Sequence, residues 1–369
     1  MAFEFTALKH KLASAALALG VTTLLAGIAL PALAQQKIKL GTPARITYSY
    51  APFLMAIEMG YMKDEGIELE IVEFLGTSLL VPQVANKSVD IGFPSADIVI
   101  INRQPGKDYM PVRFFYNSAR SNIWEFAVLE DSPIKSIADL KGKKIGIGAL
   151  ANGNVPITRG MYKEMGMTAG KDYDFVPTGV GAPAIRALTN KDVDAFNGFD
   201  AIIAQFETAG LKIRRLDQPT KYSGLLSNGF MVHEDTLKSN PKLLSGFGRA
   251  ISKGVVACEA NMDFCVRNTW KYYPSTRGDK GTDAEQLTSG RHILESRMKR
   301  NLNFNDIGGA RRFGEYAPQV WKDYIDVLFD GGELTSKQID INSLYTNEFV
   351  PEFNKFDPAQ VQAQAKARQ

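Results

Sequence analysis

Short apolar segments alternate with amphipathic helical segments from Gln36 onward, and this alternation limits most strongly what the chain can fold into. Residues 37–41 predict a strand, residues 51–63 predict a helix with Pro52 in its first turn, and residues 67–74 predict a second strand. A strand, a turn and a helix recurring in this order are typical of α/β architecture with largely parallel sheets.

The pattern also contains an internal repetition. Asn-Lys-Ser-Val-Asp at residues 86–90 follows an apolar helical segment and precedes a short strand, and Asn-Lys-Asp-Val-Asp at residues 190–194 does the same. Two lobes of like construction would explain the repetition, whereas the alternative is chance similarity of an ordinary helix end and strand start. The length of 369 residues favours two domains, because a single core rarely keeps growing beyond ~250–300 residues.

The order of the segments predicts that the chain crosses between the lobes twice. A strand at residues 126–129 is expected to carry the chain into the second lobe, and a strand at residues 229–232 is expected to return it. We therefore expect lobe 1 to comprise residues 35–126 and the mostly helical residues 231–369, and lobe 2 to comprise residues 127–230.

Residues 1–34 carry the features of a secretory signal peptide. Basic residues precede an uncharged apolar run over residues 12–30, and Ala32 and Ala34 supply the small side chains that the signal peptidase recognises. Cleavage after Ala34 would place the protein in the periplasm. The alternative is an uncleaved membrane anchor, because the apolar run approaches the ~20 residues that span a bilayer.

The two cysteines, Cys258 and Cys265, lie in residues 251–270, which we expect to form one helix. The helical rise then places them ~10 Å apart along the axis, which is beyond the reach of a disulfide. We therefore expect both thiols to stay unbridged.

Motifs of catalysis and metal binding do not occur after Ala34. The two histidines there, His233 and His292, lack ligand-spaced neighbours, so we expect neither a zinc site nor a Ser-His-acid triad. A glycine-rich turn at residues 146–153 departs from the G-x-G-x-x-G spacing of dinucleotide sites. We expect no catalytic residue, metal or cofactor, and the small net charge of +3 gives no reason to expect nucleic acid as a partner.

Glycine, hydroxyl and amide side chains gather where predicted strands end and helices begin. Such turns present free backbone N–H groups, which suit an anion, at the edge of an α/β sheet where ligands bind. N-capping is the alternative role for each turn taken singly. The candidate ligand-binding residues from these segments are Thr77, Ser78, Ser95, Asp97, Asn152, Asn154, Gly181 and Asn197.

Aromatic and arginine side chains near the predicted turns and crossings form a second set of candidates. Aromatic rings could sandwich a flat ligand, although packing in the interior is the alternative for each; these residues are Tyr48, Tyr50, Trp124 and Tyr222. Arg45 and Arg120 carry guanidinium groups that fit a carboxylate or a sulfonate, and a solvated surface position is the alternative for both.

Several longer runs carry a family resemblance. These are Gly-Tyr-Met-Lys-Asp-Glu-Gly-Ile-Glu-Leu-Glu at residues 60–70, Val-Asp-Ile-Gly at 89–92, Asp-Leu-Lys-Gly-Lys at 139–143, Val-Asp-Ala at 193–195 and Gly-Gly-Glu-Leu at 331–334. Together they resemble the nitrate, sulfonate, taurine and thiamine-pyrimidine branch of the solute-binding proteins of ABC importers.

The resemblance implies a type II periplasmic-binding-protein fold. This is an α/β fold of two lobes, each a mostly parallel sheet flanked by helices, with two hinge crossings and closure around the ligand. It further implies no catalysis, an inner-membrane ABC permease with its ATPase as partner, and a monomer. The Cys-Cys-Cys-Phe-Cys motif of the pyrimidine-synthesising relatives is missing from this sequence.

The function we expect is uptake of a small organic anion, either a sulfonate or an aromatic or aliphatic carboxylate. An alternative ligand is a thiamine-pyrimidine precursor, whose amino group would donate to Asp97 or Glu125. An exported hydrolase or synthase is the alternative from another class, because a fold by itself does not set a function.

Overall fold

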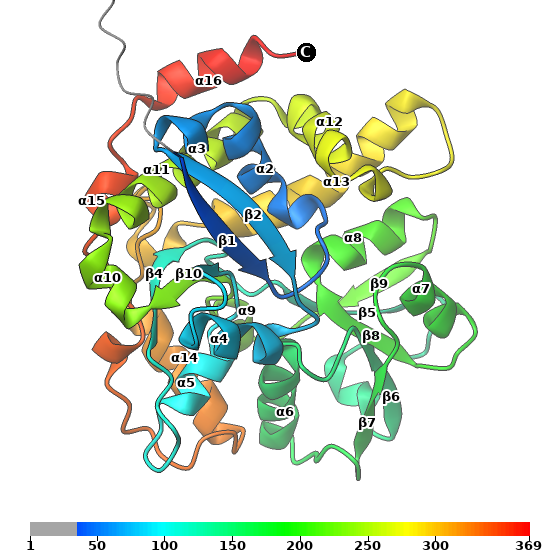
Figure 1. The fold of residues 1–369 in the computed structure, drawn as a ribbon. Helices are drawn as coiled ribbons and strands as arrows, with labels where there is room; N and C mark the ends of the chain where they lie inside the picture. Colours follow the sequence, from blue (N-terminus) through cyan, green and yellow to red (C-terminus); the bar gives the residue numbers. More distant parts are fainter. Residues whose placement is uncertain (1–34) are drawn as a thin grey trace, which may run out of the picture. The chain divides into compact units, whose positions relative to one another are not determined.

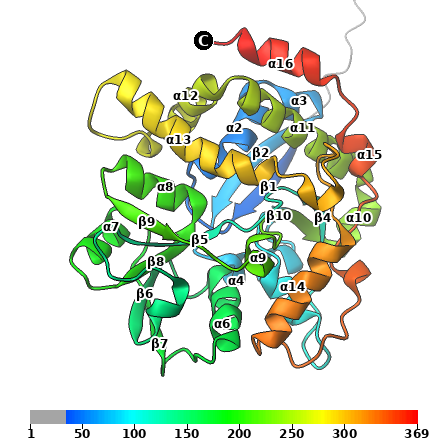
Figure 2. The same cartoon turned by 180° about the vertical axis from the view of Figure 1, so that it is seen from behind.

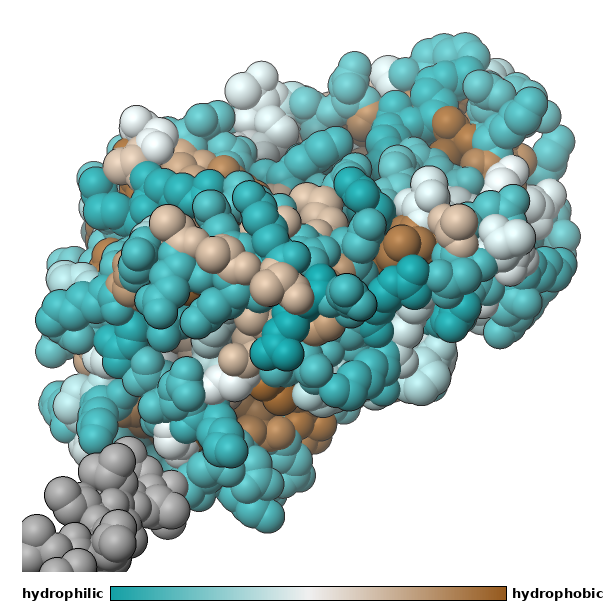
Figure 3. All heavy atoms as spheres, turned by 90° about the horizontal axis from the view of Figure 1, so that it is seen from above, coloured by the Kyte–Doolittle hydropathy of each residue, from teal (hydrophilic) through white to brown (hydrophobic). Residues whose placement is uncertain are grey.

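The computed structural model describes residues 35–369, within which residues 36–369 form one compact unit. The predicted signal peptide lies outside the described residues. In the described part, no helix is both long and apolar enough to cross a membrane. The face shown in Figure 3 is mostly hydrophilic.

Five strands form the first sheet in the order β2-β1-β3-β10-β4 (Figure 1). They are β1 (Gln36–Thr42), β2 (Ile67–Glu73), β3 (Ile91–Gly92), β4 (Val112–Asn117) and β10 (Gly229–His233). β1 pairs in parallel with β2 and β3, whereas β10 runs antiparallel to both of its neighbours.

A second five-stranded sheet has the order β7-β6-β8-β5-β9. Its strands are β5 (Trp124–Leu129), β6 (Lys143–Ile147), β7 (Tyr173–Pro177), β8 (Ala195–Phe199) and β9 (Ile213–Leu216). β6 is parallel to β7 and β8, and β5 is antiparallel to its neighbours. Each sheet therefore has a single opposed strand, and the expected α/β architecture with mostly parallel sheets is confirmed.

Helices surround both sheets (Figures 1 and 2). The first part of the chain contains η1 (Tyr48–Tyr50), α2 (Ala51–Glu58), α3 (Tyr61–Asp64), α4 (Thr77–Ala85) and α5 (Asp97–Asn102). Between β5 and β10 lie η2 (Ile137–Leu140), α6 (Asn154–Glu164), α7 (Ala182–Thr189), α8 (Asp200–Thr208) and α9 (Thr220–Ser223). The helix expected over residues 51–63 is interrupted at Gly60, whose φ of 79° is left-handed.

The chain after β10 is mostly helical, as expected. It contains α10 (Glu234–Ser239), α11 (Pro241–Ala260), α12 (Met262–Tyr272), η3 (Pro274–Thr276), α13 (Asp283–Asn301), η4 (Asn305–Ile307), α14 (Pro318–Asp330), η5 (Ile341–Ser343), α15 (Val350–Phe353) and α16 (Pro358–Lys366). α13 packs both on η1 and on α8, so it connects the segments of the first and second sheets (Figure 2).

The chain passes from the first sheet to the second between β4 and β5, and it returns between β9 and β10. The strand expected at residues 126–129 to carry the chain across therefore belongs wholly to the second sheet, and the crossing precedes it. The lobe limits at residues 126 and 230 stay predictions.

The internal repetition corresponds to the same local structure in both sheets. Lys87 and Lys191 are the non-glycine residues with positive φ in the described part of the chain, each at 62°. Asp90 accepts the backbone N–H of Lys39 in β1 at 2.8 Å, and Asp194 accepts that of Lys144 in β6 at 2.9 Å. Equivalent turns at equivalent places in one topology confirm that the two lobes are of like construction.

Phenylalanine rings form the core of the first lobe. The ring of Phe93, which follows β3, lies 4.8 Å from that of Phe230 in β10 and 4.9 Å from that of Phe53 in α2. Phe247 of α11 is 4.9 Å from Phe230. Burial of each ring contributes roughly 1.5–3 kcal/mol, so the cluster fixes the returning strand beside the turns that form the site.

Cys258 and Cys265 form a disulfide, so the expectation of unbridged thiols is wrong. Residues 251–270 are not one helix, because α11 ends at Ala260, α12 begins at Met262, and Asn261 between them has φ −145° and ψ 81°. This break brings the two Cα atoms to 5.2 Å, a separation common for disulfides.

Candidate functional site

The glycine- and hydroxyl-rich turns follow β1, β2, β3, β6 and β7, which places them at the carboxyl ends of these strands. Residues from the turns after β1, β2, β6 and β7 line one common cavity. The carboxyl edges of the two sheets therefore face each other, as expected for a ligand site in an α/β fold.

Three neighbouring cavities lie between the two lobes. The outer groove has a volume of 890 Å³ and is lined by residues that include Arg45, Tyr48, Glu73, Gly181, Gln205 and Ile293. The apolar chamber has a volume of 320 Å³ and is lined mainly by Pro43, Leu75, Ala149, Val180, Pro183 and Phe199. The polar niche has a volume of 30 Å³ and is lined by residues that include Ser49, Tyr50, Thr77, Trp124, Asn152 and Arg297.

These cavities share walls. Arg45 and Val180 line both the outer groove and the apolar chamber. Asn152 and Phe199 line both the apolar chamber and the polar niche. The chamber therefore lies between the outer groove and the niche.

Hydrogen-bond donors without partners mark the polar niche. Ser49 and Trp124 are 3% and 8% exposed, and within the described residues neither Ser49 Oγ nor Trp124 Nε1 has a hydrogen-bond partner. Leaving such a buried group unsatisfied costs ~1–3 kcal/mol. Since a space of 30 Å³ holds about one water molecule, the niche can satisfy them with water or, after a small opening, with ligand acceptors.

Arg297 of α13 joins the niche to the second lobe. Its Nε and Nη2 donate to the Asp200 carboxylate of α8 at 2.6–3.1 Å, and the two side chains are 3% and 1% exposed. Nη1 takes no part in these bonds. The pair therefore holds α13 against α8 and leaves one edge of the guanidinium for another acceptor.

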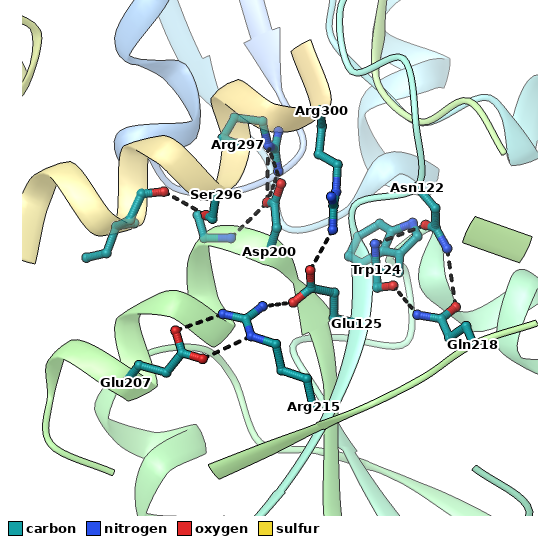
Figure 4. A network of polar contacts seen from close by, with 12 residues as sticks. Asn122, Trp124, Glu125, Asp200, Glu207, Arg215, Gln218, Ser296, Arg297 and Arg300 are labelled. Atoms are coloured by element: carbon teal, nitrogen blue, oxygen red, sulfur yellow. Dashed lines mark hydrogen bonds and ion pairs between the residues drawn. The ribbon is translucent and has the colours of Figure 1, made fainter. Parts of the chain in front are cut away.

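Further ion pairs extend this connection (Figure 4). Arg300, one turn beyond Arg297, donates to Glu125 of β5 at 2.7 Å. Arg215 of β9 bonds both Glu125 and Glu207 of α8. Arg297 and Arg300 of α13 thus contact carboxylates from two elements of the second lobe, α8 and β5.

A model of the NMT1/THI5-like family matches residues 47–262, which is more than half of the chain. The chain belongs to the NMT1/THI5-like family. The expected resemblance to the nitrate, sulfonate and thiamine-pyrimidine branch is thereby confirmed at the level of the family.

Two relatives and one solved structure show what this chain is similar to. The riboflavin-binding protein RibY of Chloroflexus aurantiacus is 25% identical over 323 residues, covering 86% of each chain. The 4-amino-5-hydroxymethyl-2-methylpyrimidine phosphate synthase of Uromyces fabae is 25% identical over 323 residues, covering 82% of this chain and 84% of the relative. The periplasmic nitrate-binding protein NrtA of Synechocystis PCC 6803 superposes with a TM-score of 0.62 at 14% identity, covering 91% of this chain and 99% of that one, which confirms the periplasmic-binding-protein fold.

The fold brings half of the sequence-predicted site residues of this NMT1/THI5-like protein to the cavities. Those that line them are Arg45, Tyr48, Tyr50, Thr77, Trp124, Asn152 and Gly181. Tyr48 is fixed in place, because its hydroxyl accepts the Trp270 indole N–H at 2.6 Å and donates to the Thr276 carbonyl at 3.0 Å. Burial raises the pKa of both Tyr48 and Tyr50, so each phenol stays neutral.

Ser95 and Asp97 lie behind the niche and support it. Thr77 Oγ1 and Ser95 Oγ are 2.9 Å apart, and Ser95 Oγ also donates to the Asp97 carboxylate. Burial raises the pKa of Asp97 to about 6. Gly153 of the opposite lobe rests on this cluster so closely that a Cβ atom there would lie 2.0 Å from Ser95 Oγ, which is why only glycine fits.

The remaining predicted residues contact protein groups and do not line the three cavities. Ser78 Oγ donates across the lobes to the Ala151 carbonyl at 3.4 Å. Asn154 donates to Asn197, and Asn197 donates to the Glu125 carbonyl, so these amides join α6, β8 and β5. Tyr222 is buried in α9.

Arg120 also departs from the expectation of an anion-binding side chain. Its guanidinium is buried and binds both carboxylate oxygens of Asp306 at 2.7–3.0 Å. Phe304 covers the same guanidinium at 5.0 Å. An arginine that is already paired and stacked inside the protein is not placed to receive a ligand, so we remove Arg120 from the candidate set.

Sequence reasoning missed several lining residues, notably Ser49, Phe199, Asn228 and Arg297. Ser49 stands between the predicted Tyr48 and Tyr50, so the same turn argument could have included it. Arg297 gave no such signal, because it lies within a polar helix far from any predicted turn.

Proposed function

We propose that this protein is the periplasmic solute-binding component of an ABC importer and that it captures a small organic anion between its lobes. In this proposal the signal peptide is cleaved after Ala34, and the loaded protein, a monomer, delivers its ligand to an inner-membrane permease with its ATPase. Membership of the family and the likeness to a nitrate-binding protein support the transport role.

The observation that carries the proposed ligand is the set of donors in the polar niche. Ser49 Oγ, Trp124 Nε1 and Arg297 Nη1 can all donate, and a carboxylate or sulfonate offers several acceptor oxygens in a small volume. Arg45 adds an exposed positive charge between the outer groove and the chamber, so an anion would also be attracted on entry.

The pyrimidine alternative is less well supported by the carboxylates named for it. Asp97 lies behind the niche and accepts from Ser95. Glu125 pairs with Arg215 and Arg300. Neither side chain lines a cavity between the lobes, so neither is placed to accept from a ligand amino group.

Catalysis, which the name of the Uromyces fabae relative raises, has no support from the histidines. His233 caps α10 by accepting the Asp235 N–H, and His292 pairs with Glu207 at 2.7 Å. Neither histidine lines the outer groove, the chamber or the niche. We therefore propose binding without turnover.

A thermal-shift screen of purified residues 35–369 tests the proposal. The panel comprises sulfonates, carboxylates, nitrate, riboflavin and thiamine-related pyrimidines. A ligand at 100 times its dissociation constant adds ~2.7 kcal/mol of stability, which is a clear rise in melting temperature. We expect a sulfonate or carboxylate to give the largest rise, and a response to pyrimidines or riboflavin alone would refute the anion.

Niche variants show whether the same ligand uses the proposed donors. We expect Ser49→Ala and Trp124→Phe each to weaken binding of the anion by about ten- to a hundredfold, because each removes a hydrogen bond to a charged group. Ser252→Ala is the matched control, since Ser252 is equally buried but bonds Tyr116 and the Gly248 carbonyl in the core. Unchanged affinity in both niche variants would exclude the niche as the head-group site.

A further inference from the structure

Apolar side chains form most of the wall of the apolar chamber, and Arg45 and Asn152, which it shares with the neighbouring cavities, are its charged and polar side chains. Seven of its lining side chains are apolar: Pro43, Ala44, Leu75, Ala149, Val180, Pro183 and Phe199. Its volume of 320 Å³ is about ten times that of the niche, and it falls within the range of about 300–1,000 Å³ typical of organic-ligand pockets.

Both lobes contribute apolar side chains that remain uncovered at this chamber. Leu75, which precedes α4 in the first lobe, is 66% exposed, and Val180, which precedes α7 in the second lobe, is 37% exposed. Large apolar side chains left in water forgo roughly 25 cal/mol for each Å² that a partner could cover. An apolar group placed between them would be covered from both sides at once.

The polar niche and the apolar chamber are adjacent. Asn152 and Phe199 line both cavities, so a ligand that extends past these two side chains would reach from one space into the other. The niche supplies donors and, after a small opening, takes no more than a head group, whereas most of the chamber wall is apolar. The two adjacent spaces therefore suit a ligand with one polar end and one apolar end.

We propose that the ligand is an amphipathic organic acid, with a single acidic head in the polar niche and a bulky apolar body in the apolar chamber. This inference rests on the proposed function and names the substrate class of the same site. Nitrate or a short-chain acid would satisfy the niche but leave Leu75 and Val180 exposed, so such anions bind only weakly.

A homologous series of acids tests the proposal by calorimetry on purified residues 35–369. The series keeps one head and enlarges the body, from methanesulfonate through butanesulfonate to octanesulfonate, and from acetate through benzoate to naphthoate. Each methylene buried in the chamber should tighten binding about fourfold until the chamber is full. Neutral alcohols with the same bodies are measured beside them.

Two leucine variants test whether the apolar body of the ligand binds in the chamber. Leu75→Ser should weaken binding of the largest acids about five- to tenfold and leave the smallest acids unchanged. Leu150→Ser is the matched control, because Leu150 is 57% exposed on a neighbouring turn but does not line the chamber. Both leucines are exposed, so neither change removes a core contact.

The outcomes separate this inference from the proposed function. If the affinity for the acids does not depend on the size of the apolar body, the proposal of an amphipathic ligand is wrong, but the proposed binding of an anion stands. If the alcohols bind as tightly as the matching acids, the proposed acidic head is wrong, but the proposed apolar body stands. If no member of either series binds, both proposals are wrong.

Discussion

Removing the guanidinium of Arg297 should weaken the connection between the lobes more than any other single ion-pair change in the site. In Arg297→Met, the Asp200 carboxylate loses all three hydrogen bonds from its partner and keeps the Ala201 N–H at 2.8 Å. Breaking a buried pair by removing one partner costs ~3–5 kcal/mol, because it leaves an uncompensated charge. The Ala201 N–H and the N-terminus of α8 still stabilise the Asp200 carboxylate, so we expect the destabilisation to lie at the lower end of this range, ~3 kcal/mol.

The lobes can relieve part of this cost by separating, because separation returns Asp200 to water. We therefore expect Arg297→Met to lower the urea midpoint, to raise the radius of gyration measured by small-angle X-ray scattering, or both. The double variant Arg297→Met/Asp200→Leu removes both charges, and its stability should return to within ~1 kcal/mol of the parent protein.

An ion pair within the first lobe provides the control for the Arg297 and Asp200 variants. Arg249 and Glu65 form a bidentate pair at 2.7 Å between α11 and the segment after α3, and both side chains are partly exposed. Arg249→Met should cost no more than ~1 kcal/mol and leave the radius of gyration unchanged. The reasoning is refuted if Arg297→Met changes neither stability nor size, or if the double variant is as unstable as the single one.

Two further predictions concern stability. Because burial raises the pKa of Asp97 from its ordinary 3.8 to about 6, the native state binds a proton that the unfolded chain releases, and stability should fall by at most ~3 kcal/mol as pH rises from 4 to 6. Asp97→Asn should remove this fall in urea unfolding at pH 4.5 and 7, and a parent-to-variant difference that is independent of pH would contradict the assignment. Cys258→Ser opens the short loop that the disulfide with Cys265 closes, so it should lower the free energy of unfolding by ~2–3 kcal/mol; equal stability of the parent protein with and without reductant would argue against any contribution from the bond.

Local patterns in the sequence were sufficient to predict the strands and helices of the fold, because apolar alternation and turn residues reflect interactions between residues that are close in the sequence. The strands predicted at residues 37–41 and 67–74 are β1 and β2 with shifts of one residue at their ends. The helix break at Asn261 escaped this reasoning. Its signal is an N-cap, since Asn261 Oδ1 accepts the Phe264 N–H, but the surrounding apolar period favours one continuous helix.

The candidate site was only half predictable, and the two arginines show why. Arg120 and Arg297 are both surrounded by polar residues in the sequence, and what distinguishes them is the partner that the fold brings to each. Asp306 lies 186 residues from Arg120, and Asp200 lies 97 residues from Arg297. Each aspartate accepts from Nε and Nη2 of its arginine, but of the two arginines only Arg297 lines one of the three cavities. A pairing over such distances is decided by how the sheets and α13 pack, which no local pattern records.

The same contrast explains how one helix can serve both closure and recognition. α13 places Arg297 and Arg300 one turn apart, so both face the second lobe, yet only Arg297 also lines the polar niche. An acidic head bound to Nη1 would share the guanidinium with Asp200 and add a second acceptor to a buried cation that has one carboxylate. Binding of the head and closure of the lobes would then strengthen each other, because residues of both lobes line the niche and closure brings them together. Repulsion between the head and the Asp200 carboxylate would reduce this gain.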